Sequence, residues 1–131
     1  MSILVAGGAG YIGAHVVRLL LERGDRVIVV DDLSYGIPDR VEGAELVQLD
    51  VASGEAVDVL TDVMEQRGVT AVIHFAARKQ VGESVARPGW YYQQNVGGLA
   101  NMLLAMERAG VGQMIFSSSA AVYGMPPIEV V

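Results

Sequence analysis

Four glycines near the start of the chain restrict its possible folds more than any other feature of the sequence. They lie between a short apolar segment, residues 3–6, and a segment with apolar residues at helical spacing that ends at Gly24. A second apolar segment, residues 26–30, follows and ends at two aspartates. The order strand, glycine turn, helix and strand is typical of the first unit of a doubly wound parallel sheet.

The four glycines are spaced as in the fingerprint of dinucleotide-binding proteins. Gly8, Gly10 and Gly13 fit Gly-x-Gly-x-x-Gly, and a wider form of the pattern begins at Gly7. One glycine forms the tight bend, one lets the backbone approach a pyrophosphate, and one allows close packing of helix on strand. The pyrophosphate rests on unpaired N–H groups at the helix N-terminus. The turn therefore predicts a nucleotide site, although a glycine-rich turn without a ligand has the same pattern.

An acidic residue at the end of the second predicted strand favours one type of dinucleotide. Asp31 lies 18 residues after Gly13. A carboxylate at this position accepts hydrogen bonds from the hydroxyls of the adenosine ribose and repels a 2′-phosphate. We therefore expect NAD rather than NADP.

The composition fits this unit and excludes several classes of protein. The chain has 131 residues, enough for one domain, and 52% hydrophobic with 18% charged residues suits a sheet buried on both faces. The net charge of −6 argues against nucleic acid and anionic membranes as partners. Without cysteine, a disulfide framework and a thiolate metal site are excluded, and we expect no metal. Because no apolar run reaches membrane-spanning length and no signal peptide is evident, we expect a cytoplasmic protein.

The remaining pattern predicts the rest of an α/β fold, a doubly wound parallel (Rossmann) sheet truncated at about five strands. Three further strands are expected at residues 44–49, 70–75 and 113–117, and one helix at residues 53–66. A long helix is expected from Pro88, with a core-facing stripe of Tyr92, Val96, Leu99, Leu103 and Met106. We also expect core positions for Met64, Met102, Met106 and, as a packed strand residue, His74.

Several features have two interpretations from sequence alone. The loop at residues 33–43 would close over the adenosine or simply connect two elements. Asp50 would border the adenine or cap the next helix. Lys79, the single lysine, would lie on the cofactor side or be a solvated surface residue. Residues 117–119, three serines, would face the ligand crevice or form a turn, and residues 90–92, three aromatics, would form a subunit contact or, more in keeping with aromatic anchors, pack in the core.

Five segments together resemble the N-terminal half of the UDP-glucose 4-epimerase (UDP-galactose 4-epimerase) family, within the extended short-chain dehydrogenase/reductases. These segments are GGAGYIGAH, VDDLSYG, HFAARKQVGESV, PGWYYQQNVGG and FSSSAAVYG. The glycine turn and SSS-x-x-VYG are shared with the wider group of nucleotide-sugar epimerases and dehydratases, whereas KQVGESV is closer to the 4-epimerases. The resemblance implies interconversion of UDP-glucose and UDP-galactose by transient oxidation at C4, with a tightly held NAD that is recycled in place.

The resemblance also implies which residues hold NAD and which one acts on the sugar. Ser119 matches the serine that hydrogen-bonds the reacting sugar hydroxyl, and is the one catalytic residue implied. The implied cofactor residues are Gly7, Gly10, Tyr11, Ile12 and Gly13 at the pyrophosphate; Asp31, Asp32, Leu33, Ser34, Tyr35 and Gly36 along the adenosine; Asp50 and Val51 at the adenine; Phe75, Ala76, Ala77 and Lys79 at the nicotinamide; and Asn95, or Gln94 beside it, together with Ser117.

Three departures from the family pattern affect what we expect of the chain. Ala6 and Ala14 stand where relatives commonly have Thr and Ser, and Ala121 replaces an expected threonine near the substrate. The family's general base lies in a Tyr-x-x-x-Lys pair, which these 131 residues lack, since Tyr123 has no lysine four residues later. We therefore expect residues 1–131 to be an incomplete NAD-binding Rossmann domain, without the Tyr-x-x-x-Lys helix and the C-terminal substrate domain, and inactive alone.

Two alternatives and one consequence for assembly remain at this stage. The chain would otherwise be a free-standing NAD-binding sensor or interaction module, or part of another nucleotide-sugar epimerase or dehydratase. A UDP-sugar is the partner expected of the full-length form. A sheet that ends at a fifth strand leaves an unpaired edge, and such edges pair with other chains. We therefore expect self-association or a homodimer.

Overall fold

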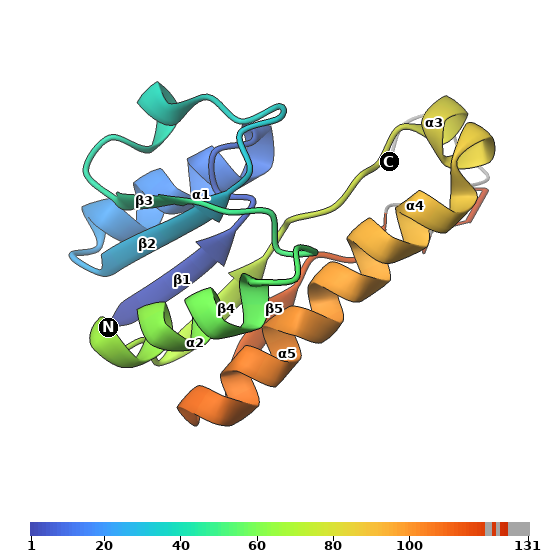
Figure 1. The fold of residues 1–131 in the computed structure, drawn as a ribbon. Helices are drawn as coiled ribbons and strands as arrows, with labels where there is room; N and C mark the ends of the chain where they lie inside the picture. Colours follow the sequence, from blue (N-terminus) through green and yellow to red (C-terminus); the bar gives the residue numbers. More distant parts are fainter. Residues whose placement is uncertain (120–121, 123, 126–131) are drawn as a thin grey trace.

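The computed structural model describes residues 1–119, 122 and 124–125, and its centre is a five-stranded parallel sheet (Figure 1). The strand order is β3-β2-β1-β4-β5, with every neighbouring pair parallel. The order reverses direction at β1, which confirms the doubly wound prediction. The strands are β1 (Ser2–Ala6), β2 (Arg26–Asp31), β3 (Glu45–Gln48), β4 (Ala71–His74) and β5 (Met114–Phe116).

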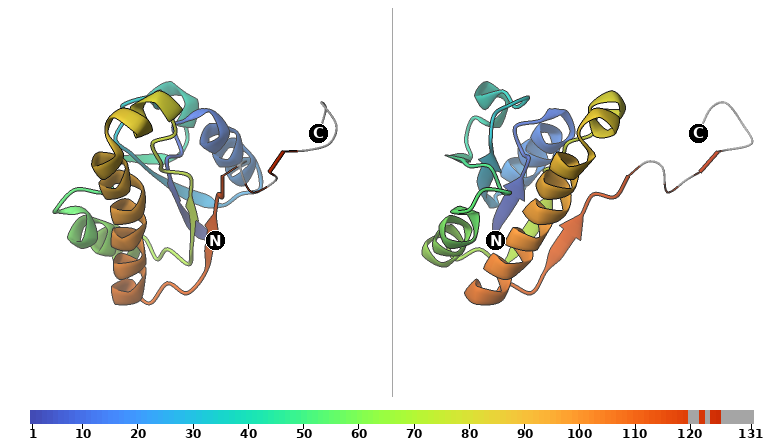
Figure 2. Two further views of the ribbon diagram at one scale, coloured as in Figure 1. Left: turned by 90° about the vertical axis from the view of Figure 1, so that its right-hand side faces the viewer. Right: turned by 45° about the vertical axis from the view of Figure 1, so that its right-hand side comes forward.

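Helices cover both faces of the sheet (Figures 1 and 2). One face carries α1 (Tyr11–Glu22) and the short 3₁₀ helix η1 (Pro38–Val41), and the other carries α2 (Ala56–Gln66) and α5 (Gly98–Ala109). Before α5, the short helix α4 (Pro88–Tyr92) and the π-helical turn η2 (Gln93–Gly97) form one continuous rod with it (Figure 2). The helix α3 (Val81–Ala86) was not predicted, because its two valines are exposed and give no buried apolar stripe.

Alternate residues of the central strands build two separate cores. Ile3 and Val5 of β1 pack with Val17 of α1 on one face. Leu4 of β1 packs on the other face with Met102 of α5. All five are almost fully buried, since both faces of a parallel sheet are covered by helices.

The long helical rod forms as predicted but buries a stripe of side chains that shares only Met106 with the predicted one. Tyr92, Val96 and Leu103 are 71%, 58% and 48% exposed, so their predicted core positions were wrong. The buried stripe contains Tyr91, Gly98, Met102, Ala105 and Met106. Both stripes have helical spacing, and periodicity alone cannot choose between them.

Close packing explains which stripe is buried. A Cβ added at Gly98 would lie 2.9 Å from a methyl group of Val51, so this turn of the helix contacts its neighbour without space for a side chain. The predictions for Met64, Met102 and Met106 as core residues are confirmed.

The glycine turn provides a direct test of this packing. A Cβ on Gly13 would lie 2.4 Å from the carbonyl oxygen of Gly7 and 2.8 Å from the Cα of Gly8. Because these atoms belong to the backbone, Gly13→Ala is expected to lower the free energy of unfolding by about 2 kcal/mol or more. Urea denaturation measures this change.

Gly97→Ala is the matched control, because nothing lies within 4 Å of a Cβ at this helical glycine. It should leave the free energy of unfolding unchanged or raise it by up to about 1 kcal/mol. Equal destabilisation by both substitutions would contradict the close helix–strand contact.

Candidate functional site

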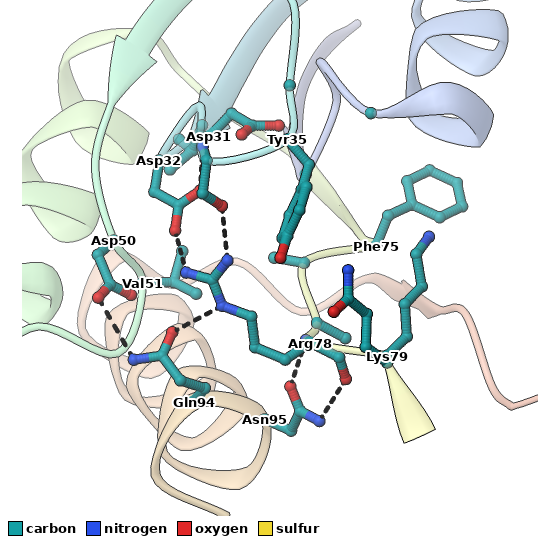
Figure 3. A pocket seen from close by; sticks show the side chains of 18 of the residues that line it. Asp31, Asp32, Tyr35, Asp50, Val51, Phe75, Arg78, Lys79, Gln94 and Asn95 are labelled. Carbon is teal, nitrogen blue, oxygen red and sulfur yellow. Dashed lines mark hydrogen bonds and ion pairs between the residues drawn. The ribbon is translucent and has the colours of Figure 1, made fainter. Parts of the chain in front are cut away.

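A cavity of about 350 Å³ lies at the carboxyl ends of β1, β2, β3 and β4 (Figure 3). Its walls are the glycine turn, the loops that follow β2, β3 and β4, and the helical stretch α4–η2. The predicted cofactor residues that line it are Gly7, Gly10, Tyr11, Asp31, Asp32, Ser34, Tyr35, Gly36, Asp50, Val51, Phe75, Ala76, Ala77, Lys79 and Asn95. All of them except Asn95, which lies on η2, belong to strand ends or to the segments that follow strands, which brings them together as expected for this fold.

Three of the four turn glycines are explained by contacts within the protein. Gly7 has a φ of +76°, and a Cβ there would lie 2.8 Å from the backbone nitrogen of Ala76. A Cβ on Gly8 would lie 2.9 Å from Val29. Together with Gly13, these residues let the turn pack closely against β2, α1 and the segment that follows β4.

Gly10 is different, because the fold itself does not need a glycine there. Its φ of −73° and ψ of −179° are open to any residue, and a Cβ would meet only the carbonyl oxygen of Gly7, at 3.4 Å. Gly10 lines the cavity. A molecule lying in the cavity against the backbone would give this position a reason to lack a side chain.

Gly10 is also the N-cap of α1, and no side chain caps this helix end. The N–H groups of a first helical turn have no partners within their helix, and the helix dipole makes that end positive. Tyr11 and Ile12 begin the turn with exposed side chains. The arrangement suits an anion such as a pyrophosphate.

Asp31 joins the glycine turn to the loop after β2. One carboxylate oxygen accepts a hydrogen bond from the N–H of Ala9 at 3.0 Å, and the other accepts one from the N–H of Leu33 at 2.8 Å. Asp31 is only 9% exposed, and a Cβ on Gly36 would lie 2.8 Å from its Oδ1. Each carboxylate oxygen retains a lone pair, so Asp31 can bind a ribose while it organises the loop.

The charged residue that sequence reasoning missed is Arg78. It lines the cavity, with its side chain 14% exposed, and its Nη2 donates to Asp32 Oδ2 at 2.5 Å (Figure 3). Burial alone would raise the pKa of Asp32, but hydrogen bonds from Ser34 and the charge of Arg78 outweigh burial and lower it. Lys79, which the sequence singled out, lines the same cavity and makes no ion pair within the part of the chain described.

Two polar side chains on η2 hold the other wall. Asn95 pairs with the backbone of Arg78, accepting from its N–H at 2.7 Å and donating to its carbonyl at 2.9 Å. Gln94 donates to Asp50 at 3.4 Å. Asp50 also accepts from the N–H of Ala52, while α2 begins only at Ala56. The helix-cap interpretation of Asp50 was therefore wrong, because its carboxylate closes a tight turn before the helix.

Aromatic residues of α4 extend this wall. The buried Tyr91 accepts from the N–H of Gln80 at 3.0 Å and donates to Glu83 at 2.9 Å, which confirms packing as its role. Trp90 lies under two guanidinium groups, those of Arg78 and Arg87. Nothing in the sequence predicted roles for Gln80 and Glu83, because both act through the hydroxyl of Tyr91, which only the fold brings to them.

Five predicted site residues do not line the cavity. Gly13 and Leu33 support the turn and the loop from behind, and Ile12 is exposed on α1. Ser117 and Ser119 follow β5 and are exposed, with the N–H of Ser117 donating to the carbonyl of His74. The predictions on Ala121 and Tyr123 lie outside the described residues.

His74 is a packed strand residue, as predicted. It is buried at the end of β4, with its ring 5.9 Å from that of Phe116 in a stacked arrangement. Burial lowers the pKa of His74, which favours the neutral imidazole. Its position is behind the cavity rather than within it.

Neither a metal cluster nor a membrane helix occurs among the described residues. No three His, Asp or Glu side chains gather there as metal ligands would. None of the described helices is long and apolar enough to cross a membrane.

Comparison with known proteins gives consistent results for sequence and structure. Residues 3–130 match the profile of the NAD dependent epimerase/dehydratase family. The chain is 44% identical over 134 residues to UDP-glucose 4-epimerase 3 of Oryza sativa subsp. japonica, covering 95% of this chain and 36% of that protein. It is 42% identical to a UDP-glucose 4-epimerase sequence from Klebsiella pneumoniae, covering 97% of this chain and 95% of that sequence.

Solved structures show the same relationship. A UDP-glucose 4-epimerase from Stenotrophomonas maltophila with bound NAD and formylated UDP-arabinopyranose matches with a TM-score of 0.88 and 38% identity, covering all of this chain and 40% of that one. A UDP-glucose 4-epimerase from Brucella ovis in complex with NAD matches with a TM-score of 0.87 and 41% identity, covering 98% of this chain and 38% of that one. The chain thus spans about two fifths of the length of most of these relatives. On the match over residues 3–130 and these identities, the chain belongs to the NAD dependent epimerase/dehydratase family.

Proposed function

We propose that this chain binds NAD in the cavity and forms the cofactor-binding part of a protein that interconverts UDP-glucose and UDP-galactose. Family membership and the NAD-bound relatives from Stenotrophomonas maltophila and Brucella ovis support the cofactor. The 131 residues contain no Tyr-x-x-x-Lys pair, and the chain spans about two fifths of most relatives. We therefore propose that residues 1–131 are an NAD-binding domain whose general base and sugar site come from sequence outside them.

The observation that carries the proposal is the glycine at position 10. The backbone conformation and the surrounding protein atoms both permit a side chain there, yet the residue is glycine and lines the cavity. A pyrophosphate on the N-terminus of α1 supplies the missing reason, because it needs the backbone N–H groups within hydrogen-bonding distance.

The other cavity residues fit the parts of NAD in order. Asp31 would accept the hydroxyls of the adenosine ribose, and Asp50 and Val51 would border the adenine. The small Ala76 and Ala77 leave space for the nicotinamide, and Lys79 would neutralise phosphate charge. When bound, NAD would supply the hydride acceptor, while the chain's part is to orient the cofactor.

Gly10→Ala separates ligand binding from folding. We expect the free energy of unfolding to change by less than about 1 kcal/mol, because the Cβ meets ordinary contacts. NAD affinity should fall by on the order of tenfold or more, because the Cβ occupies space that the pyrophosphate needs. Calorimetric titration of NAD into the protein made from its native gene measures this, with Gly97→Ala as the control. Unchanged affinity in Gly10→Ala would argue against a pyrophosphate at this turn.

Turnover assays separate the proposed epimerase from the alternatives. The 131-residue chain alone should not interconvert UDP-glucose and UDP-galactose, since it lacks the Tyr-x-x-x-Lys pair. The protein made from its native gene should interconvert them in a panel of UDP-hexoses and UDP-pentoses. Activity only on a pentose would indicate a related epimerase, and NAD binding without turnover would indicate a sensor or interaction module.

We further propose that the chain self-associates through the outer edge of its sheet. Within the described part of the chain, β5 pairs only with β4, and its residues Ile115 and Phe116 are 64% and 53% exposed. An exposed apolar edge strand favours pairing with another chain.

Sedimentation velocity tests the proposed association of the 131-residue chain. The wild-type chain should sediment as a species larger than a monomer. Ile115→Lys should shift the sedimentation distribution toward monomer, because a charged side chain on β5 opposes pairing of this edge strand with another chain. Leu19→Lys, on the exposed side of α1, is the control and should leave the distribution unchanged. A wild-type monomer at all concentrations would overturn this assembly.

A further inference from the structure

We propose that Arg78 acts as a latch across the adenosine end of the cavity and slows the release of the dinucleotide. This inference rests on the proposed function, since it takes NAD as the occupant of the cavity. It concerns a residue that the cofactor assignments above do not include. The side chain of Arg78 joins the loop after β2 to the η2 wall beside the cavity.

The first side of the latch is the loop that follows β2. The Nη2 of Arg78 donates to Asp32 and its Nη1 donates to Ser34 Oγ, both at 2.5 Å. The guanidinium also lies 5.9 Å from the ring centre of Tyr35. One planar guanidinium thus contacts three residues of one loop, with its charge facing a carboxylate.

The second side of the latch is the α4–η2 wall. The Nε of Arg78 points to the Oε1 of Gln94 at 3.4 Å, and its guanidinium lies 5.2 Å from the ring of Trp90. Asn95 clamps the backbone of Arg78 by two hydrogen bonds. Since Gln94 also reaches Asp50, side chains connect Asp32 to Asp50 through Arg78 around one end of the cavity (Figure 3).

The position of this chain of contacts identifies the part of the ligand beneath it. Asp31 lies beside Asp32 at the proposed ribose position, and Val51 lies beside Asp50 at the proposed adenine position (Figure 3). Arg78 therefore bridges the two walls that enclose the adenosine. An adenosine in this position leaves more easily when the bridge opens.

The strength of the bridge follows from its burial. The side chains of Arg78 and Asp32 are 14% and 28% exposed, so water screens their attraction less than that of a surface pair. The lowered pKa of Asp32 agrees with a carboxylate held in its charged form.

Release of NADH, followed by its fluorescence after displacement with excess NAD, tests the latch in the protein made from its native gene. Arg78→Met should accelerate release by on the order of tenfold, the effect of removing a charge-assisted hydrogen-bonded pair. The release rate of Arg78→Lys should lie between those of wild type and Arg78→Met, because lysine keeps the charge but lacks the planar guanidinium. Arg87→Met is the matched control, since Arg87 lies 4.1 Å over the same Trp90 but does not line the cavity.

Asp32→Asn distinguishes a latch from a direct contact between Arg78 and the ligand. If Arg78 acts through Asp32, the single variants and the double variant should all release NADH at similar rates, because each breaks the same pair. Added salt should accelerate release from wild type but not from Arg78→Met. Thermal melting of the ligand-free variants measures any general loss of stability separately.

The possible outcomes separate this inference from the function on which it rests. If wild type does not bind NADH, the proposed function fails. If wild type binds and Arg78→Met releases NADH at the wild-type rate, only the latch is overturned. Additive effects of the two substitutions would also overturn it, because they would mean that Arg78 holds the ligand directly.

Discussion

The carboxylate of Asp31 is the interaction on which the site depends most. Its two oxygens accept hydrogen bonds from the N–H groups of Ala9 and Leu33, which belong to the glycine turn and to the loop after β2. A buried carboxylate that accepts hydrogen bonds from both segments holds them in one arrangement. The same group is the proposed ribose acceptor, so the residue that orders the site would also contact the ligand.

Different kinds of contact hold the inner and outer walls of the cavity. The glycine turn is set by backbone approaches that leave no space for a Cβ at Gly7 or Gly13. The outer wall is held by side chains instead, chiefly Arg78 and Asn95. A floor fixed by backbone contacts and an outer wall held by side chains would suit the proposed NAD, which must be oriented closely.

Much of this could be predicted from the sequence, for reasons that are local. The glycine spacing and the apolar segments predicted five parallel strands, because both faces of the sheet demand continuous apolar residues. Most predicted cofactor residues line one cavity because strand ends meet at one edge. The core positions predicted for Tyr92, Val96 and Leu103 were wrong although that for Met106 was right, because two stripes on this helical rod have helical spacing. The close approach of Gly98 to Val51 lies on the stripe that is buried.

Arg78 illustrates what remained beyond sequence reasoning. Its partner Asp32 is 46 residues away, and nothing in the sequence marked Arg78, whereas the neighbouring Lys79 stood out as the single lysine. A long charged side chain takes its position from tertiary partners rather than from local propensity. The same holds for Gln80 and Glu83, whose roles follow from the hydroxyl of Tyr91.

The central claim is that the glycine turn is a preformed pyrophosphate site that binds NAD. The most direct measurement is an NMR titration that follows the backbone amides of this chain as NAD is added. The account predicts that the largest shifts occur at Gly10, Tyr11 and Ile12, with smaller shifts at Asp31 and Val51. Shifts confined to residues outside the cavity, or no saturable shift at the turn, would contradict it.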